Sequence, residues 1–297
     1  MELILKVNEL GFLPYLNSPV DSFIIGLKDF CVNQNYSLSL KELSDSIEQI
    51  KESNKKIYLN TNIFALEKDI KRLNKIMSKL SLLNIDGFIV SDIGFLNIFK
   101  KHNLADKVIL DLHTYVTNKY SAKSLLNLGI KRVCIAKEIT LDDIKEIAIF
   151  SEGNIEILAQ GFYPITYSKR TILDAYYKNF KLNKQSDIHY IKEENRDSYY
   201  CVTQTNNNLA VYYDKQYSVF PYLKDLIESK VQYFRIDADF LDDSSIRKYI
   251  SYYKKGIEAI KNNDIKKYNE LTIEFGKDNN FETPFMHNKS FLLKEGN

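Results

Sequence analysis

Residues 156–177 read EILAQGFYPITYSKRTILDAYY, and the interpretation of the whole chain starts from this stretch. Its first residues form a short apolar run that is typical of a strand buried on both faces. Gly161 marks a turn, and the polar residues 167–170 precede a pattern that predicts a helix. A buried strand that leads through a turn into a helix is the repeating unit of α/β folds.

The same alternation of strand and helix extends through most of the chain. Ser39 and Glu42 form a capping box ahead of an apolar stripe, and Thr140 opens another helix. Helices are also predicted at 248–262 and 265–275. Short apolar or β-branched runs predict eight strands, at residues 3–7, 22–25, 56–59, 87–90, 107–112, 132–136, 155–159 and 232–237.

Eight strands with this spacing predict an α/β fold, the (β/α)8 barrel of TIM type, or a distorted or incomplete version of it. An open doubly wound sheet is the alternative, but no glycine-rich phosphate-binding turn follows the first strand. We expect residues 1–180 and 231–275 to form the barrel and residues 276–297 to form a C-terminal tail. Residues 181–230 are predicted to be an insertion with a β-hairpin over one mouth of the barrel, because two β-rich runs flank an asparagine-rich turn.

Composition excludes several classes of protein. The 297 residues carry a formal net charge of +2, which indicates no strong overall field for nucleic acid or acidic lipid. No apolar run approaches the roughly 20 residues that span a bilayer, and the N-terminus has no signal-peptide pattern. We therefore expect a cytoplasmic protein without a membrane partner. Cys31, Cys134 and Cys201 lie far apart, so neither a zinc ribbon nor a disulfide framework is indicated.

In a barrel of this type, functional side chains lie at the carboxyl ends of the strands. The residues predicted there are polar and of mixed charge, which suits a small anion or a nucleotide. These loops are also polar simply because they carry helix caps. The ligand-binding candidates are Asn60, His113, Thr114, Lys137, Glu138, Gln160, Gly161 and Asp237, to which the opening stretch adds Tyr167, Ser168, Lys169 and Arg170.

Other chemistries are less well indicated. No spacing of His, Cys and carboxylate side chains predicts a metal site, and Asp242 and Asp243 read as a helix cap. No hydrolase signature surrounds Ser168 or Cys31. Lys169 and Arg170 stand among tyrosines, a combination that RNA-binding surfaces use for phosphate contact and base stacking. A general abundance of tyrosine in this sequence explains the same pattern.

The stretch at 156–177 is similar to the signature segment of peptidase family U32, the collagenase-like protease family. Segments 112–117, 128–138, 193–200 and 234–239 also resemble this family, so the resemblance covers most of the chain. Family members typically carry two cysteines in the signature segment, and these help to hold an iron–sulfur cluster. The corresponding residues here are Pro164 and Thr171, so the resemblance implies no iron–sulfur centre on this chain.

The resemblance also implies a function. It implies oxygen-independent or prephenate-dependent hydroxylation of tRNA wobble uridine, of ribosomal RNA or of ubiquinone precursors. We expect a cluster-less partner subunit in tRNA hydroxylation, working with a larger, cluster-bearing paralogue, in contact with tRNA and with a prephenate-like small acid as candidate ligand. The alternatives are a U32-type peptidase and a non-catalytic interaction barrel, so enzymatic activity stays open. Relatives usually have Arg-Glu at Lys137-Glu138 and often have Arg at Asn33.

Overall fold

The computed structural model describes residues 1–183, 186, 188–194, 198–205, 208–277, 281–283 and 285–287. Eight parallel strands close into a barrel that resembles a TIM barrel, because β14 pairs with both β1 and β8. This confirms the predicted fold class, and each predicted strand agrees with the observed bounds to within two residues. The strands are β1 (Glu2–Lys6), β2 (Ser22–Leu27), β4 (Lys56–Asn60), β5 (Gly87–Val90), β6 (Val108–Asp111), β7 (Arg132–Cys134), β8 (Ile155–Gly161) and β14 (Tyr233–Asp237).

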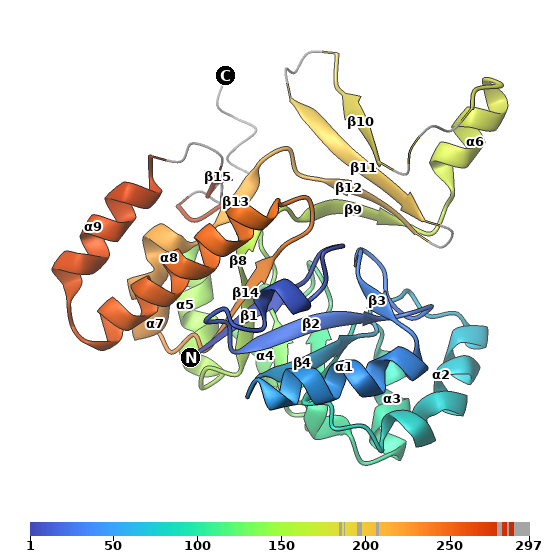
Figure 1. Ribbon diagram of the computed structural model, residues 1–297, viewed down its shortest axis with the longest axis horizontal. Coiled ribbons are helices and arrows are strands. Elements are labelled where there is room, and N and C mark those ends of the chain that lie inside the picture. Colours follow the sequence, from blue (N-terminus) through green and yellow to red (C-terminus); the bar gives the residue numbers. More distant parts are fainter. Residues whose placement is uncertain are drawn as a thin grey trace.

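Helices cover the outside of the barrel (Figure 1). The predicted capping boxes of Ser39 and Thr140 are present, and Asp242 caps α8 as expected. Between β1 and β2 the described chain forms a 3-10 turn, η1 (Leu13–Tyr15), in place of an α-helix. No helix of the described residues is long and apolar enough to cross a membrane. The helices are α1 (Leu40–Glu52), α2 (Glu67–Leu80), α3 (Ile93–Lys101), α4 (Lys119–Leu126), α5 (Leu141–Phe150), α7 (Leu223–Glu228), α8 (Asp243–Lys261) and α9 (Ile265–Phe275).

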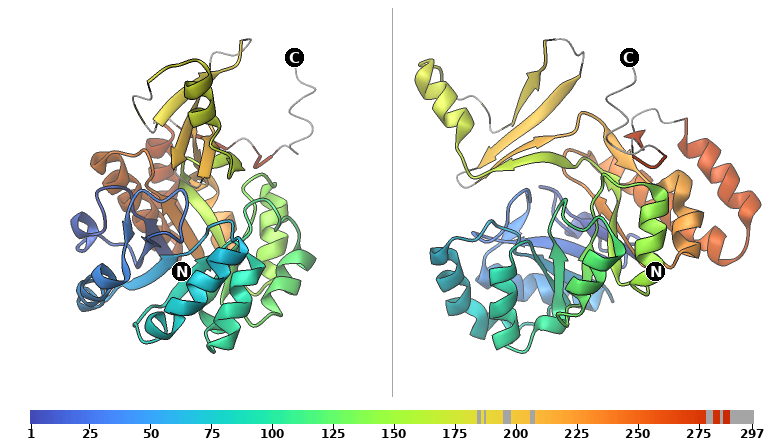
Figure 2. Two further views of the ribbon diagram at one scale, coloured as in Figure 1. Left: turned by 90° about the vertical axis from the view of Figure 1, so that its right-hand side faces the viewer. Right: turned by 180° about the vertical axis from the view of Figure 1, so that it is seen from behind.

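A second sheet stands over one end of the barrel, with α6 (Ile172–Asn179) at its side (Figures 1 and 2). We call it the lid sheet. Its β11 and β12 form the predicted hairpin, although the turn residues Asn206 and Asn207 lie outside the described residues. Its strand order is β10 (Ile188–Lys192), β11 (Tyr199–Thr205), β12 (Asn208–Tyr212) and β9 (Pro164–Ser168).

The boundaries of the insertion differ from the predicted 181–230. β9 leaves the barrel and pairs with β12, so the insertion runs over residues 164–212. Residues 216–228 return to the barrel, where β13 (Gln216–Ser218) pairs with β8, and Leu223 and Leu226 of α7 are fully buried. In the tail, β15 (Phe281–Glu282) pairs with β13, whereas Pro284 and residues 288–297 lie outside the described residues.

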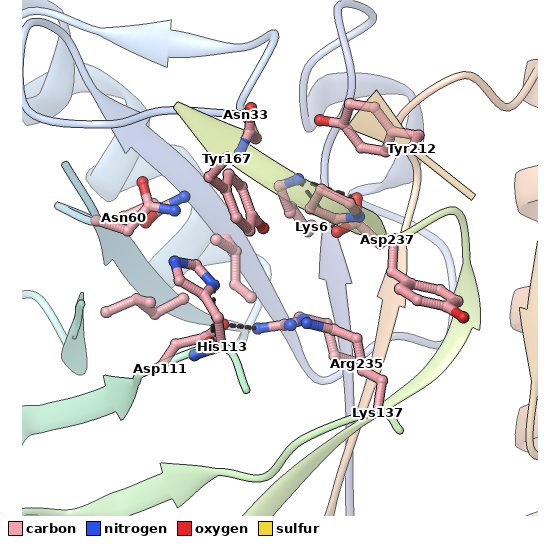
Figure 3. A pocket seen from close by; sticks show the side chains of 15 residues that line it. Lys6, Asn33, Asn60, Asp111, His113, Lys137, Tyr167, Tyr212, Arg235 and Asp237 are labelled. Carbon is pink, nitrogen blue, oxygen red and sulfur yellow. Dashed lines mark hydrogen bonds and ion pairs between the residues drawn. The ribbon is translucent and has the colours of Figure 1, made fainter. Parts of the chain in front are cut away.

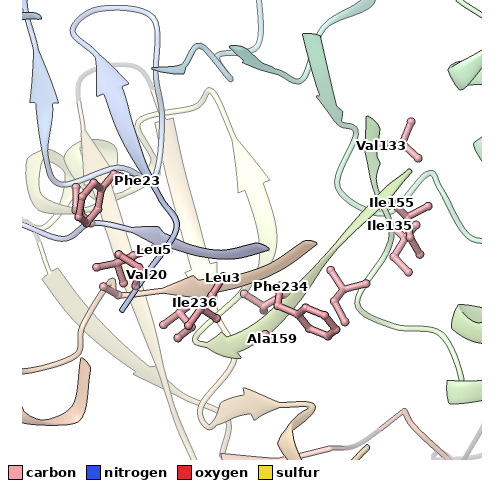
Figure 4. Packing of buried hydrophobic residues seen from close by; sticks show 14 of the residues in the cluster. Leu3, Leu5, Val20, Phe23, Val133, Ile135, Ile155, Ala159, Phe234 and Ile236 are labelled. Carbon is pink, nitrogen blue, oxygen red and sulfur yellow. The ribbon is translucent and has the colours of Figure 1, made fainter. Parts of the chain in front are cut away.

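Alternate residues of each barrel strand point outward and inward. Outward residues such as Leu3, Leu5 and Phe234 pack in the large core beneath the helices (Figure 4). A smaller apolar cluster, which includes Ile4 and Ile24, forms separately from that core. Charged residues such as Lys6 and Arg235 take part in buried ion pairs on these strands.

The buried charges on the barrel strands are paired. Arg132 is fully buried, and its guanidinium lies between the rings of Tyr58 and Tyr233, 4.4 and 4.2 Å from their centroids. Its Nε donates to Glu156 at 2.8 Å, and Glu156 also accepts from Arg235 at 3.0 Å. A carboxylate that serves two buried guanidiniums cannot be removed without leaving uncompensated charge in the interior.

Glu156→Gln therefore lowers the free energy of unfolding by about 3–5 kcal/mol, because Arg132 loses its carboxylate partner and Arg235 keeps only Asp111. The matched control is Glu228→Gln, which removes an exposed i,i+4 pair with Lys224 and costs no more than about 0.5 kcal/mol. Urea denaturation of both variants measures the difference. Equal losses for the two substitutions contradict this account of the barrel interior.

Candidate functional site

The lid sheet closes the mouth of the barrel at the carboxyl ends of the strands. Beneath it lies a small cavity of about 30 Å³, which is room for one or two water molecules. Tyr167 and Tyr212 come from the lid sheet, and the other polar lining residues come mostly from the barrel (Figure 3). The polar lining comprises Lys6, Asn33, Asn60, Asn62, Asp111, His113, Lys137, Tyr163, Tyr167, Tyr212, Arg235 and Asp237.

Lys6 anchors one side of this cavity. Its ammonium contacts Asp237 at 3.0 Å and also contacts Asp239, and all three side chains are nearly inaccessible. Although burial disfavours the charge, the two carboxylates raise the pKa of Lys6. Burial raises the pKa of Asp239 to about 7, with Asp237 adding to the shift and Lys6 opposing it. Lys6 is thus held as a cation by its partners.

Arg235 and Asp111 form the other side. Arg235 donates to Asp111 at 3.1 Å. Burial favours the neutral acid, but Arg235 and then Lys137 lower the pKa of Asp111 well below its usual range. His113 lies two residues further along the chain, with φ of 58° and a backbone N–H that donates to Asp111 at 3.2 Å. A positive φ is uncommon for a side-chain-bearing residue, and here it places the ring over the cavity, 4.5 Å from the ring centroid of Tyr167.

Lys137 is the one lysine of this mouth without a counterion in the described part of the chain. Lys137 lines the cavity and is half-buried. Burial lowers the pKa of Lys137, and Arg235 lowers it further, while Asp111 opposes the shift. A desolvated amine beside another cation is the usual setting of a lysine that binds or reacts as a neutral group.

Two larger hollows adjoin the cavity. An outer pocket of about 240 Å³ shares His113, Lys137 and Tyr167 with it and adds apolar walls from Phe64, Leu112 and Ile165. On the other side, a cleft of about 670 Å³ opens between the lid sheet and the barrel loops. Asn208 of the lid donates to Asn33 of the barrel at 2.8 Å beside this cleft. The lid sheet therefore borders two separate spaces, the outer pocket and the cleft, rather than a single one.

The structure brings together part of the predicted site. Asn60, His113, Lys137, Tyr167 and Asp237 line the cavity, whereas Thr114 and Glu138 line the outer pocket.

The other predicted residues lie elsewhere. Gln160 is buried and donates to Gln216 at 3.1 Å. Gly161 has φ of 133°, and a Cβ there would meet the Asp237 carbonyl oxygen at 2.4 Å, so its role is to let β8 and β14 approach. At the far end of β9, the Ser168 hydroxyl accepts from the Arg170 N–H at 3.1 Å, and Lys169 and Arg170 are exposed.

Lys6, Tyr212 and Arg235 belong to the site but were not among the predicted residues. For Lys6 and Arg235 a signal existed, because each is a basic residue in a strand that is otherwise mostly apolar. Such a residue at an inward position of a barrel strand indicates a paired, functional charge. Tyr212 gave no comparable signal, because its place depends on how the lid sheet docks on the barrel.

The residues at the expected cluster positions do not fit an iron–sulfur cluster. Pro164 opens β9 and lines the cavity, and Thr171 precedes α6 at the surface, so neither side chain supplies a thiolate. Cys31, Cys134 and Cys201 are free cysteines. The described residues contain no group of three or more His, Cys, Asp or Glu side chains arranged to hold a metal ion.

Comparison with known proteins shows to which family this chain belongs. The chain matches Peptidase family U32 over residues 12–294. It is 19% identical over 269 residues to tRNA hydroxylation protein P2 of Bacillus subtilis, a match that covers 88% of this chain and 87% of that protein. It is 29% identical over 183 residues to an uncharacterized protease of Methanocaldococcus jannaschii, covering 59% of this chain and 44% of that protease.

Among solved structures, N-acetylneuraminate lyase from Mycoplasma synoviae matches with a TM-score of 0.52 and 9% identity, over 93% of this chain and 80% of that one. A likeness at this level of identity concerns the barrel fold alone. The family match, in contrast, covers nearly the whole chain and confirms the resemblance seen in the sequence. The chain therefore belongs to peptidase family U32.

Proposed function

We propose that this chain takes part in the hydroxylation of tRNA, with the wobble uridine as its target nucleoside. The proposal draws on the match to the Bacillus subtilis tRNA hydroxylation protein P2, which extends over most of both chains. Shorter matches, over 58% and 80% of this chain, go to proteins named tRNA hydroxylation protein P and P1. For a protein with this role we expect a location in the cytoplasm.

The barrel mouth in this proposal binds a small carboxylic acid, such as a prephenate-like compound. The observation that carries this assignment is the Lys137 side chain, which lines both the cavity and the outer pocket and has no counterion among the described residues. Arg235, although paired, adds positive charge beside it. A carboxylate entering the outer pocket gains a charge-assisted hydrogen bond from Lys137 and apolar contact with the pocket walls.

The chain acts in this proposal as the partner of a larger, cluster-bearing U32 protein. Pro164 and Thr171 offer no ligands for a cluster, so a hydroxylation that depends on one requires a second polypeptide. tRNA contacts the complex either at the exposed Lys169 and Arg170 or through the larger subunit.

A peptidase is the second candidate, because the relative from Methanocaldococcus jannaschii is named as a protease. Peptide hydrolysis through a covalent intermediate requires an activated serine or cysteine beside a base. The residues that line the central cavity and the outer pocket include neither type. Cys31 lines the separate cleft, and burial raises the pKa of its thiol to about 12, which disfavours the thiolate.

Mass spectrometry of bulk tRNA tests the proposed function. A strain that lacks this gene is expected to lose hydroxylated wobble uridine, and the wild-type gene restores it. Lys137→Ala fails to restore it, because the amine at the barrel mouth is gone. The double variant Lys169→Ala/Arg170→Ala is the matched control for loss of charge outside the cavity. If it restores hydroxylated wobble uridine, the activity depends on the barrel mouth. If it fails to do so, the activity also requires contact between this surface and RNA.

An unchanged tRNA profile, in a strain without a redundant paralogue, contradicts a role in tRNA hydroxylation. An assay of peptide hydrolysis, carried out on the wild type and on the Lys137→Ala variant, then separates a peptidase from a non-catalytic interaction barrel.

Co-purification tests the partner role. Affinity-tagged protein from its native host is expected to bring down a larger U32 protein whose visible absorption shows an iron–sulfur cluster, because this chain lacks the thiolates at the cluster positions. The isolated chain is expected to show no such absorption after reconstitution with iron and sulfide. A chain that hydroxylates tRNA alone contradicts the partner role without affecting the assignment to tRNA hydroxylation.

A further inference from the structure

Two other groups with free polar atoms share the space of Lys137. The His113 Nε2 and the Tyr163 hydroxyl are buried, and neither has a hydrogen-bond partner among the described residues. Both side chains line the cavity and the outer pocket together with Lys137. Buried polar atoms are nearly always satisfied in folded proteins. In the described part of the chain, a lysine without a counterion thus shares one space with an imidazole nitrogen and a phenol that have no hydrogen-bond partner, and this arrangement indicates a site built for chemistry on a bound molecule.

The walls of this space indicate what kind of molecule it takes. Arg235, and Lys137 in its protonated form, favour a carboxylate on the inner side, because each then carries a positive charge at the mouth. The outer pocket is walled by Phe64, Leu112 and Ile165, which suit an apolar or ring-bearing substituent. A volume of about 240 Å³ accommodates a small acid.

We propose that Lys137 is a nucleophilic amine that forms an imine with the carbonyl group of a small 2-oxo acid bound at the barrel mouth. This inference deepens the proposed binding of a small acid at this site and rests on it. It adds a covalent step and restricts the ligand to acids with a carbonyl carbon within reach of the amine.

The step balances without an oxidant or a reductant. The lone pair of neutral Lys137 attacks the carbonyl carbon, a C–N bond forms, and the carbonyl oxygen takes a proton to give a carbinolamine. The nitrogen loses one proton as the carbinolamine forms and a second as the protonated hydroxyl leaves as water, so that a C=N bond remains. One amine and one ketone thus give one imine and one water. His113 and Tyr163 are the groups placed to carry these protons.

The electrostatic surroundings agree with this role. Burial and the guanidinium of Arg235 lower the pKa of Lys137, which increases the fraction of neutral amine, whereas Asp111, Cys134 and Asp237 oppose the shift. Burial also lowers the pKa of His113, so its ring is neutral at pH 7 and accepts a proton. Lys6 lies at the same mouth but is paired with Asp237 and Asp239, so it stays protonated and is not a nucleophile.

Reductive trapping tests the proposal. The purified full chain is incubated with phenylpyruvate and sodium cyanoborohydride, which reduces an imine to a stable secondary amine, and peptide mass spectrometry locates the adduct. We expect the adduct predominantly at Lys137. Phenyllactate, which has a hydroxyl in place of the carbonyl, is expected to compete for the site and to leave no adduct.

Lys137→Arg is the matched variant, because it keeps the positive charge and cannot form a stable imine. It is expected to lose the adduct entirely, while calorimetry with phenyllactate and the wild-type protein measures acid binding separately. Its melting temperature, compared with that of the wild type, checks that it is folded. The exposed Lys169 serves as an internal measure of nonspecific labelling.

The outcomes separate the two proposals. An adduct at Lys137 no greater than at Lys169, in a protein that binds phenyllactate, overturns the imine and leaves acid binding at the mouth intact. Absence of both the adduct and phenyllactate binding overturns both the imine and the small-acid site.

Discussion

The double pairing of Arg235 is the interaction on which the rest of the site depends. Its guanidinium donates to Glu156, which also holds the fully buried Arg132, and to Asp111 at the mouth. A single cation in a barrel interior costs several kcal/mol unless it is paired, so each charge in this chain of contacts requires the next. The charges at the mouth therefore depend on Glu156 deep in the barrel. A substitution of Asp111 in turn disturbs the ion pairs of the interior. This coupling explains why a small cavity retains so many ionised groups.

The lid sheet converts this charged mouth into an enclosed space. Gly161, with its positive φ, lets β8 pass close to β14 before the chain leaves the barrel as β9. Tyr167 then lies on the His113 ring, and Tyr212 closes the opposite side. These rings shield the mouth from bulk water, and electrostatic interactions inside strengthen as the local dielectric falls. The lowered pKa values of His113 and Lys137 follow from this shielding.

The sequence predicted the barrel closely and the site only in part, and the reasons are physical. Parallel strands buried on both faces produce apolar runs with sharp ends, so all eight strands were identified. The same reasoning did not single out Lys6 and Arg235, although the alternation of side chains along a strand places them on the inward face. Within β9, neighbouring residues point to opposite faces, so Tyr167 enters the cavity while Ser168 does not. The spacing of residues in the sequence cannot give that choice, because it depends on the register of β9 with β12.

The two lysines of the mouth show how one environment gives the same side chain two different roles. Lys6 has two carboxylates in contact, and they raise its pKa, so its charge is fixed and its contribution is structural. Among the described residues Lys137 has none in contact, and a guanidinium lies nearby, so burial lowers its pKa. Since Arg235 is itself neutralised by Asp111 and Glu156, it remains in place whether or not Lys137 carries a proton. Lys137 can therefore lose its proton or form a covalent bond without any rearrangement of the ion pairs that hold the barrel together.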